Sequence, residues 1–511
     1  MRALTRRQVI GGIAGGPIAL PFARVNARNS RQTVPLLRYA GPDSGMPNPF
    51  QVSPAGPGGP ILVSLIYDTL TWKDESGIIP WLASEWSISE DGIVYTFQIE
   101  PGAICHDGAP LTVDDVAFSF TYYSGHPYVW AGSDVVESAI AEGESVRITL
   151  KRPYAAFIED IGGIVPIIPK HVWEAVDDPL TFTGADRSVG SGPYVLAEYN
   201  PTEGAYRLTA NDLYWRGTPK VAEFRQVTVP PEAVVQATRR GEIDLASSPD
   251  ASVRDILADD ERLSIHESAP LSIVRLAVNT LRAPLDRKEV RQAIAHALDR
   301  QLIAESITRG PAIVGSAGVV PPETPWFNPN LTQYAFDPDR ARELLAGEQL
   351  TINLVADARA RDPELMIPML EDVGITLKVQ SVDSPTRIQL LRDGDFQLGF
   401  MTHIGVGGDP DYLRRWYAGE ETNAFAQGSI FEDEEYMRLG EEQAATLDAA
   451  ERRDLVFRMQ EILAEELPTI VLYHRRFYWI HDPEVFAPLD TWGGLMNGIP
   501  FPHNKLALLE S

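Results

Sequence analysis

Apolar residues recur at every second position between residues 93 and 99. Ile93, Tyr95, Phe97 and Ile99 are each separated by one intervening residue. A period of two is typical of a strand with one buried face, and the Pro101-Gly102 pair that follows is typical of a turn. The pattern therefore predicts a half-buried strand that ends before residue 101.

Two segments combine helical periodicity with polar residues suited to a helix start. Thr112 and Asp115, and likewise Asp286 and Glu289, have the spacing of a capping box. Apolar residues three and four positions apart follow each pair. We predict one helix after Thr112 and a second that begins at Asp286 and continues to Gly310-Pro311.

Proline marks two further helix ends. Asp337-Pro338 predicts a helix start, because proline at the first helical position loses no hydrogen bond. Apolar residues between 455 and 467 line one face of a helix that Pro468 closes, and residues 469–473 predict a strand directly afterwards. Strands and helices are mixed along the chain, which predicts an α/β or α+β protein with several lobes.

Composition narrows the class of protein. The chain has 511 residues, of which 44% are hydrophobic and 23% charged. This is ordinary for a globular protein and excludes a disordered chain, a collagen-like fibre and a multi-span membrane protein. The net charge of −27 repels phosphate backbones, so nucleic acid is not an expected partner. With Cys105 as its single cysteine, the chain has neither an intramolecular disulfide nor a thiolate-rich metal site, and we expect no cofactor.

The first 27 residues differ from the rest. They contain four arginines, including the pair Arg6-Arg7, and no acidic residue. A short, glycine-rich apolar run and small residues near Val25-Asn26-Ala27 follow the pair. This order is typical of an export signal, and it resembles a twin-arginine signal. We expect a protein that works outside the cytoplasmic membrane; an uncleaved N-terminal anchor is the alternative.

From residue 67 onward, short motifs follow one another in a fixed order. They include Tyr67-Asp68-Thr69-Leu70, Pro80-Trp81-Leu82-Ala83, His106-Asp107-Gly108, Gly190-Ser191-Gly192-Pro193-Tyr194, Asn211-Asp212-Leu213-Tyr214-Trp215, Ala277-Val278-Asn279 and Gly408-Asp409-Pro410-Asp411. Their colinear order over about residues 35–511 resembles extracellular solute-binding protein family 5, the peptide/nickel-type receptors of ABC importers.

The resemblance implies an α/β, three-lobed periplasmic binding protein-like fold of type II, the peptide-binder class, with a hinged cleft. Domain I is expected to be discontinuous, at 28–66, 166–277 and 485–511. Domain II is expected at 67–165 and domain III at 278–484. The ligand is expected between domains I and III, which close over it about chain segments that cross between them.

The motif His106-Asp107-Gly108 also invites a metal or acid–base interpretation. Two ligand types in one loop do not make a metal site. We interpret the motif as a turn before the helix that Thr112 begins.

The resemblance implies that, in peptide-binding members of the family, the ligand adds a strand to a segment of domain III. The matching segment here is 396–410. In those members an acidic side chain, three residues before an Asp/Glu-Pro pair, holds the α-ammonium group of the ligand. The same position in this chain, three residues before Asp409-Pro410, is Val406. Valine cannot neutralise a buried cation. A free zwitterionic dipeptide is therefore disfavoured, and a glycan fragment, a capped peptide or a longer peptide is favoured.

Other positions in and near this segment complete the predicted site. His403 takes the place of an aromatic residue of oligopeptide binders. No arginine clearly matches the one that meets a peptide carboxylate in some members: Phe400 and Leu391 stand at the expected places, and Arg392 is one position off. Asp409 is interpreted as a loop-forming residue. The predicted ligand contacts are Thr402, His403, Ile404, Val406, Trp416, Tyr473, His474 and Asn279.

Several of these residues have a second interpretation. The aromatic faces of Trp416, Tyr417 and Tyr473 could stack on a sugar or an apolar ligand, or simply pack in the core. His403 and His474 could hold a metal chelate, or be ordinary polar and core residues. Substituting Val406 with aspartate is expected to admit ligands with a free ammonium group.

The leading hypothesis is a non-enzymatic receptor that binds a peptide or another oligomeric solute and delivers it to an ABC permease and its ATPase. An oligosaccharide or a nickel chelate on the same fold is the alternative. A secreted hydrolase is less favoured, since the chain has no Gly-x-Ser-x-Gly elbow and no His-Glu-x-x-His helix. A sensory binding protein would have the same fold.

Overall fold

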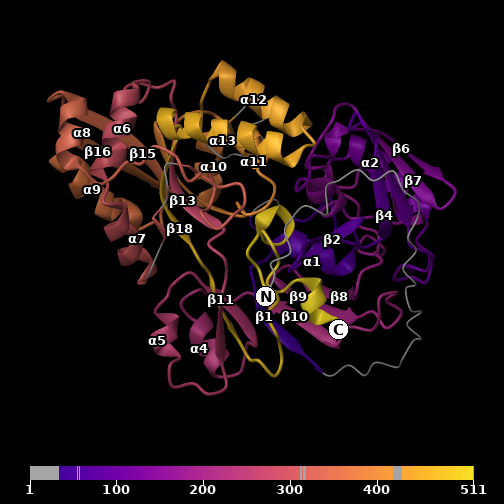
Figure 1. The fold of residues 1–511 in the computed structure, drawn as a ribbon. Coiled ribbons are helices and arrows are strands. Elements are labelled where there is room, and N and C mark those ends of the chain that lie inside the picture. The colour runs from indigo at the N-terminus through magenta and orange to yellow at the C-terminus, as the bar shows by residue number, and fades with distance from the viewer. Residues whose placement is uncertain are drawn as a thin grey trace, which may run out of the picture.

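The computed structural model describes residues 34–53, 56, 58–310, 313–314, 318–417 and 429–509. The predicted export signal, residues 1–27, lies outside these residues. Within them, helices and strands gather into three groups, and the C-terminal segment, yellow in Figure 1, runs between the groups. No helix in the described part of the chain has the length and apolar character needed to cross a membrane.

The first group is built on a seven-stranded sheet whose strands come from distant parts of the sequence. In spatial order they are β12 (Ser264–Glu267), β19 (Tyr478–His481), β11 (Leu245–Ser248), β1 (Leu37–Ala40), β10 (Glu223–Val227), β9 (Ala205–Ala210) and β8 (Tyr194–Asn200). Strand β1 is central and pairs in parallel with β10 and β11. Helix α1 (Gly58–Ile66) contacts β8, α4 (Val234–Arg239) contacts β11 and β19, and α5 (Val253–Ile256) shares a core cluster with β19. The short helix α3 (Lys170–Trp173) contacts the helix Val113–Gly125 of the third group.

The second group is built on a six-stranded sheet. Its order is β14 (Ile313–Val314), β18 (Thr469–Arg475), β13 (Ser272–Val278), β17 (Leu398–Ile404), β15 (Leu350–Asp357) and β16 (Ile375–Val382). One core cluster joins this sheet to α6 (Lys288–Ala297), α7 (Arg300–Thr308), α8 (Pro338–Leu345) and α9 (Asp362–Asp372). Two others join it to α10 (Ser384–Arg392), α11 (Tyr412–Tyr417), α12 (Glu434–Ala445) and α13 (Ala449–Glu466).

The third group is smaller. It contains a four-stranded antiparallel sheet in the order β4 (Ala83–Ile88), β5 (Val94–Ile99), β7 (Ser145–Leu150) and β6 (Val136–Glu142). Helix α2 (Val113–Gly125), the hairpin β2 (Thr71–Asp74) and β3 (Gly77–Pro80), and a π-helix, Phe157–Gly162, accompany it. Short 3-10 helices occur at Ser133–Val135, Met496–Gly498 and Lys505–Leu508.

Most elements predicted from local patterns are confirmed. Strand β5 buries Tyr95, Phe97 and Ile99 while its alternate residues are half-buried. Helix α2 begins with the predicted capping box, in which the side chain of Asp115 accepts a hydrogen bond from the Thr112 backbone N–H at 2.7 Å. Helix α8 begins at Pro338, where Asp337 caps it. The predicted helix end near Pro468 and the strand after it are also present.

The single helix predicted from Asp286 to Gly310 is wrong, because the chain forms two helices there. Helix α6 begins at Lys288 with no side-chain cap, and Leu298 is extended between it and α7. The side chain of Asp299 accepts a hydrogen bond from the backbone N–H of Leu302 at 3.0 Å. A capping aspartate in a non-helical conformation favours a new helix start, and this interrupts the helix although the apolar periodicity that suggested one helix continues.

The chain crosses between the two large sheets at two places. Strand β12 ends at Glu267 and β13 begins at Ser272, while β18 ends at Arg475 and β19 begins at Tyr478. β12 pairs with β19 and β13 with β18, so the crossings lie beside each other. Backbone bonds join them, since Ser268 N donates to the Phe477 carbonyl at 2.9 Å. The crossings lie a few residues before the domain boundaries expected at 277 and 484.

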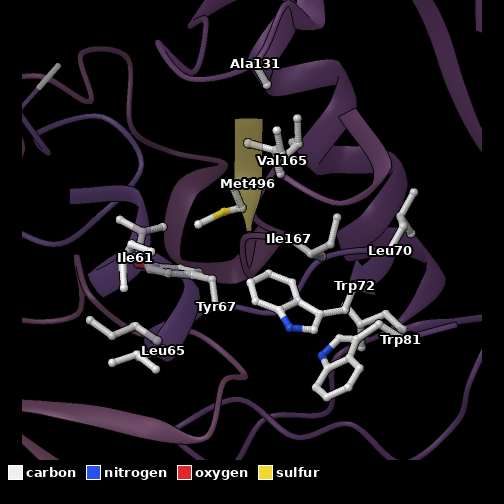
Figure 2. Close-up of a cluster of buried hydrophobic side chains, with 14 of the residues drawn as sticks. Ile61, Leu65, Tyr67, Leu70, Trp72, Trp81, Ala131, Val165, Ile167 and Met496 are labelled. Carbon is white, nitrogen blue, oxygen red and sulfur yellow. The ribbon is translucent and has the colours of Figure 1, made fainter. Parts of the chain in front are cut away.

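A buried carboxylate explains why motifs far apart in the sequence occur together. Asp68 lies beside a large aromatic core that includes Tyr67, Trp72 and Trp81, and Met496 of the C-terminal segment belongs to the same core (Figure 2). Its two oxygens accept hydrogen bonds from Trp81 Nε1 (2.6 Å), Tyr214 (2.9 Å), Trp215 Nε1 (3.0 Å), Lys505 Nζ (3.1 Å) and Ser191 (3.2 Å). Four of the quoted motifs therefore meet at one side chain.

Candidate functional site

Strand β17 carries the predicted binding segment and leaves part of one edge open. It pairs with β13 along its whole length, from Leu398 to Ile404. On its other side, β15 pairs with it only at Leu398 and Gly399. Among the described residues no strand continues this edge, and Thr402 is exposed there, while His403 and Ile404 are half-buried. An open edge of this kind can accept an additional strand.

The backbone groups that face the open edge follow from the strand's alternation. The carbonyl of Gln397 accepts a hydrogen bond from Asn279 N, and Gly405 N donates to the Leu271 carbonyl. The backbone N–H and C=O groups of the odd-numbered residues therefore point toward β13. Thr402 and Ile404 therefore direct their N–H and C=O groups toward the open edge. The edge begins at Phe400, whose carbonyl accepts a hydrogen bond from Arg387 Nη1 at 3.1 Å. No local pattern in the sequence pointed to Arg387, because only the fold brings α10 next to this strand.

Other predicted contact residues pack inside the second group in this conformation. Val406 is only 1% exposed and belongs to a core cluster with Tyr412 and Trp416. The ring of His403 meets that of Trp416 edge-on, with centroids 4.5 Å apart. Burial, together with the positive charge of Arg275, lowers the pKa of His403 to about 3, so its imidazole is neutral.

Three further predicted residues are also buried. The hydroxyl of Tyr473 donates to Asp362 Oδ1 at 2.8 Å. The side-chain amide of Asn279 donates to the carbonyls of Gly394 and Phe396, each at 3.2 Å, and so supports the turn before β17. His474 is fully buried, and burial lowers its pKa to about 4. The register places it and His403 on either side of Ile273, so one strand separates them.

Charged side chains fill the junction between the second and third groups. Arg452 forms two 2.6 Å hydrogen bonds with the carboxylate of Asp409, and Arg414 forms two 2.8 Å bonds with that of Asp411. Asp409 Oδ1 also accepts from the backbone N–H of Asp411 at 2.9 Å. The predicted loop-forming role of Asp409 is thus confirmed.

Tyr154 connects this network to the third group. Its hydroxyl lies 2.9 Å from Asp160 Oδ2 and 3.1 Å from Asp411 Oδ2. Burial raises the pKa of Asp160 to about 7, although Arg415, at 3.5 Å, opposes the shift. The pKa of Asp411 falls to about 2, because the hydrogen bonds and charge of Arg414 outweigh its burial.

A second bridge lies beside the first. Lys73 forms a short ion pair with Glu159, and Glu159 Oε1 accepts a hydrogen bond from the backbone N–H of Asp409 at 3.1 Å. A cavity of about 10 Å³, room for about one water molecule, is lined by Lys73, Glu159 and Asn497 among others. Sequence reasoning missed these bridges, since the partners are about 250 residues apart.

A larger groove of about 500 Å³ lies elsewhere, lined by Met46, His106, Arg187 and Tyr199 among others. None of the predicted ligand contacts lines either cavity. The backbone N–H of His106 donates to the Gly190 carbonyl at 2.8 Å, in a turn before α2, which confirms the structural interpretation of that motif. The described residues contain no cluster of three or more His, Cys, Asp or Glu able to hold a metal ion.

Known proteins are similar to this chain in sequence. The chain is 26% identical to heme-binding protein A of Haemophilus influenzae over 79% of its length and 80% of that protein. It is 26% identical to the dipeptide-binding protein of Escherichia coli over 78% of its length and 81% of that protein.

Solved structures agree on the fold. The periplasmic binding protein DppA of Helicobacter pylori, in complex with the peptide STSA, superposes with a TM-score of 0.79 at 24% identity, covering 89% of this chain and 95% of the other. NikZ of Campylobacter jejuni, in complex with Ni(L-His), also gives 0.79, at 20% identity, covering 94% of this chain and all of the other. These likenesses confirm the expected α/β fold of the type II peptide-binder class.

The family model for the middle region of the bacterial extracellular solute-binding proteins, family 5, matches residues 77–425. This span includes α2, the chain crossing before β13 and the open edge of β17. The chain belongs to the bacterial extracellular solute-binding proteins, family 5.

Proposed function

We propose that this chain is the substrate-binding component of a peptide-type ABC importer, which binds a peptide or another oligomeric solute and delivers it to a membrane permease and its ATPase. The observation that carries the proposal is the open edge of β17 at Thr402–Ile404, in a chain whose relatives include dipeptide-binding proteins. The proposal places the protein outside the cytoplasmic membrane and assigns it no enzymatic step.

The proposed mechanism is the addition of a ligand strand followed by lobe closure. Main-chain hydrogen bonds at Thr402 and Ile404 would hold an extended ligand irrespective of its side chains. The lobes would close by bending at the two crossings, residues 268–271 and 476–477. The two side-by-side crossings support the proposed division into domains I, II and III, because they mark where the chain enters and leaves domain III. The bridges from Tyr154 and Glu159 would stabilise the closed form.

A thermal-shift screen tests the proposal directly. Peptides of different lengths, oligosaccharides and nickel chelates are added separately to the purified chain. A ligand that binds only the folded protein, at 100 times its dissociation constant, adds about 2.7 kcal/mol to the free energy of unfolding. We expect peptides to raise the melting temperature. Absence of any shift across the panel, with no solute retained in native mass spectrometry, would contradict the receptor role.

A nickel chelate is the second candidate ligand. NikZ, whose fold this chain shares, is named with such a ligand, and His403 is neutral and half-buried beside the open edge. A neutral imidazole can ligate a metal without first losing a proton. A shift with nickel–histidine but with no peptide, removed by His403→Ala, would favour this alternative.

Position 406 supplies a prediction about selectivity. We expect Val406→Asp to lower the melting temperature of the ligand-free protein, because it places a carboxylate at a site that is 1% exposed. We also expect it to admit ligands with a free ammonium group, which would neutralise that carboxylate. The measurement is the melting temperature with matched peptides, either free or acetylated at the amino end. Val406→Ala, which changes packing alone, is the control. An unchanged preference in the aspartate variant would show that residue 406 does not face the ligand.

A further inference from the structure

The loop of residues 491–499 lies directly against the segment that follows β17. A Cβ built on Gly407 would lie 2.7 Å from the carbonyl oxygen of Gly493. A Cβ built on Gly405 would lie 2.5 Å from the carbonyl oxygen of Asn497, and one on Gly408 would lie 3.1 Å from Gly498 N. The two backbones are therefore in contact, and no side chain fits between them.

The loop has a conformation of its own. Gly493, Gly494, Asn497 and Gly498 all have positive φ, between 51° and 82°, a region that glycine and asparagine tolerate best. Leu495 N donates to the Ile499 carbonyl at 2.7 Å, which closes the loop on itself. The loop's shape is thus set by its own backbone and requires no ligand.

The loop is also anchored to the first part of the chain. Trp492 N donates to the Asp74 carbonyl at 3.0 Å, and the side-chain amide of Asn497 donates to the Trp130 carbonyl at 3.0 Å. Leu495, Met496 and Ile499 are buried in one core cluster, and Figure 2 shows Met496 among its side chains. The loop therefore stays with the first and third groups of elements, and it meets β17's end when the lobes are together, as they are here.

The open edge consequently has a limit at each end. At Phe400 the guanidinium of Arg387 holds the strand's carbonyl, and after Ile404 the loop covers Gly405–Gly408. The stretch from Phe400, included, to Ile404 contains five residues. At about 3.3 Å per residue, a ligand strand paired with all of them contains about five residues.

We propose that the loop of residues 491–499 determines ligand length, by blocking the end of the binding edge so that the closed protein accepts extended peptides of up to about five residues. This inference rests on the proposed peptide-binding function. It names the size class of the substrate and the segment that selects it.

Alanine peptides of three, five, seven and nine residues test the inference, because they differ in length and not in side-chain chemistry. Titration calorimetry on the purified chain gives their affinities. We expect the three- and five-residue peptides to bind, and the seven- and nine-residue peptides to bind at least about tenfold more weakly, which corresponds to about 1.4 kcal/mol.

A shortened loop is the decisive variant. The ends are already close, since a Cβ on Gly494 would lie 2.5 Å from the carbonyl carbon of Gly498. Deleting Leu495–Gly498 and joining Gly494 to Ile499 is expected to reduce the difference between the five- and nine-residue peptides to less than about threefold. Met496→Leu keeps the backbone and should retain the wild-type length preference.

Because Leu495 and Met496 are buried, the deletion could prevent folding, so a second measurement uses the unaltered chain. Hydrogen exchange with the five-residue peptide bound should show slower exchange both at 400–404 and at 491–499. Failure of every peptide to bind would overturn the proposed function, and this inference with it. Binding without length dependence, an unchanged cutoff in a folded deletion variant, or unaltered exchange at 491–499 would overturn the inference alone.

Discussion

Replacing Asp68 with alanine is expected to destabilise the protein by about 3–5 kcal/mol, the cost of breaking a buried ion pair by removing one partner. Asp68 and Lys505 are both 0% exposed, and their side chains lie 3.1 Å apart. Burial already lowers the pKa of Lys505 to about 8, against the attraction of Asp68. Without the carboxylate, Lys505 would lose its counter-charge, and the hydrogen-bond donors Trp81, Tyr214 and Trp215 would lose their acceptor.

Urea unfolding followed by tryptophan fluorescence measures this loss. A matched control is Asp107→Ala, which removes an aspartate whose ion pair with His171 is exposed on both sides. Such exposed pairs contribute about 0–1 kcal/mol. Equal losses in the two variants would show that Asp68 is not the shared acceptor for these motifs.

The second large effect concerns pH and Asp160. Its pKa is raised to about 7 in the folded protein, mainly by burial, from an ordinary value of 3.8. Between about pH 4 and pH 7, the folded state therefore holds on Asp160 a proton that the unfolded state has already released. By linkage, the stability that this group contributes is complete below about pH 4 and is lost as pH rises to 7. A shift of about three units, at about 1.4 kcal/mol each, sets an upper limit of about 4 kcal/mol.

The geometry around Tyr154 explains what the proton does. Asp411, with a pKa of about 2, is ionised and accepts a hydrogen bond from the Tyr154 hydroxyl. The protonated carboxyl of Asp160 can then donate to the oxygen of Tyr154, which completes a chain of hydrogen bonds from the third group to the second. Ionised Asp160 would instead face Asp409, Asp411 and Glu159, with Arg415 as its nearby cation.

We expect Asp160→Asn to flatten the dependence of the melting temperature on pH between 5 and 8. An amide cannot ionise, yet it can donate to Tyr154 as the protonated carboxyl does. Asp178→Asn is the control, because Asp178 is at the surface and the hydrogen bonds of Thr181 and Leu180 lower its pKa. A wild-type protein whose melting temperature does not fall over this range would contradict the assigned protonation of Asp160.

Local patterns in the sequence predicted the elements whose causes are local. The capping box of α2, the alternation of β5 and the proline that begins α8 depend on residues a few positions apart. The break between α6 and α7 escaped prediction because the apolar spacing continued across it, while Asp299 started a new helix. A short polar cap there outweighed the longer periodic pattern.

Interactions between distant segments could not be predicted from local patterns. The order of motifs was enough to predict the family and its fold. Only the structure shows that side chains from several of these motifs donate hydrogen bonds to one carboxylate, that of Asp68. Val406, Trp416 and Tyr473 were chosen as ligand contacts by position along the chain, and the structure shows them buried. Burial depends on the elements packed above a residue, which position alone does not reveal.

The sequence by itself determined the helices and strands with local signals, the family, and the absence of an acidic side chain at position 406. Only the tertiary structure decided which edge of β17 remains open, which arginine stands beside it, and that residues 491–499 close its end. The physical reason is range: caps and periodicity act within one element, whereas an edge is open or covered according to chain segments that lie up to about a hundred residues away.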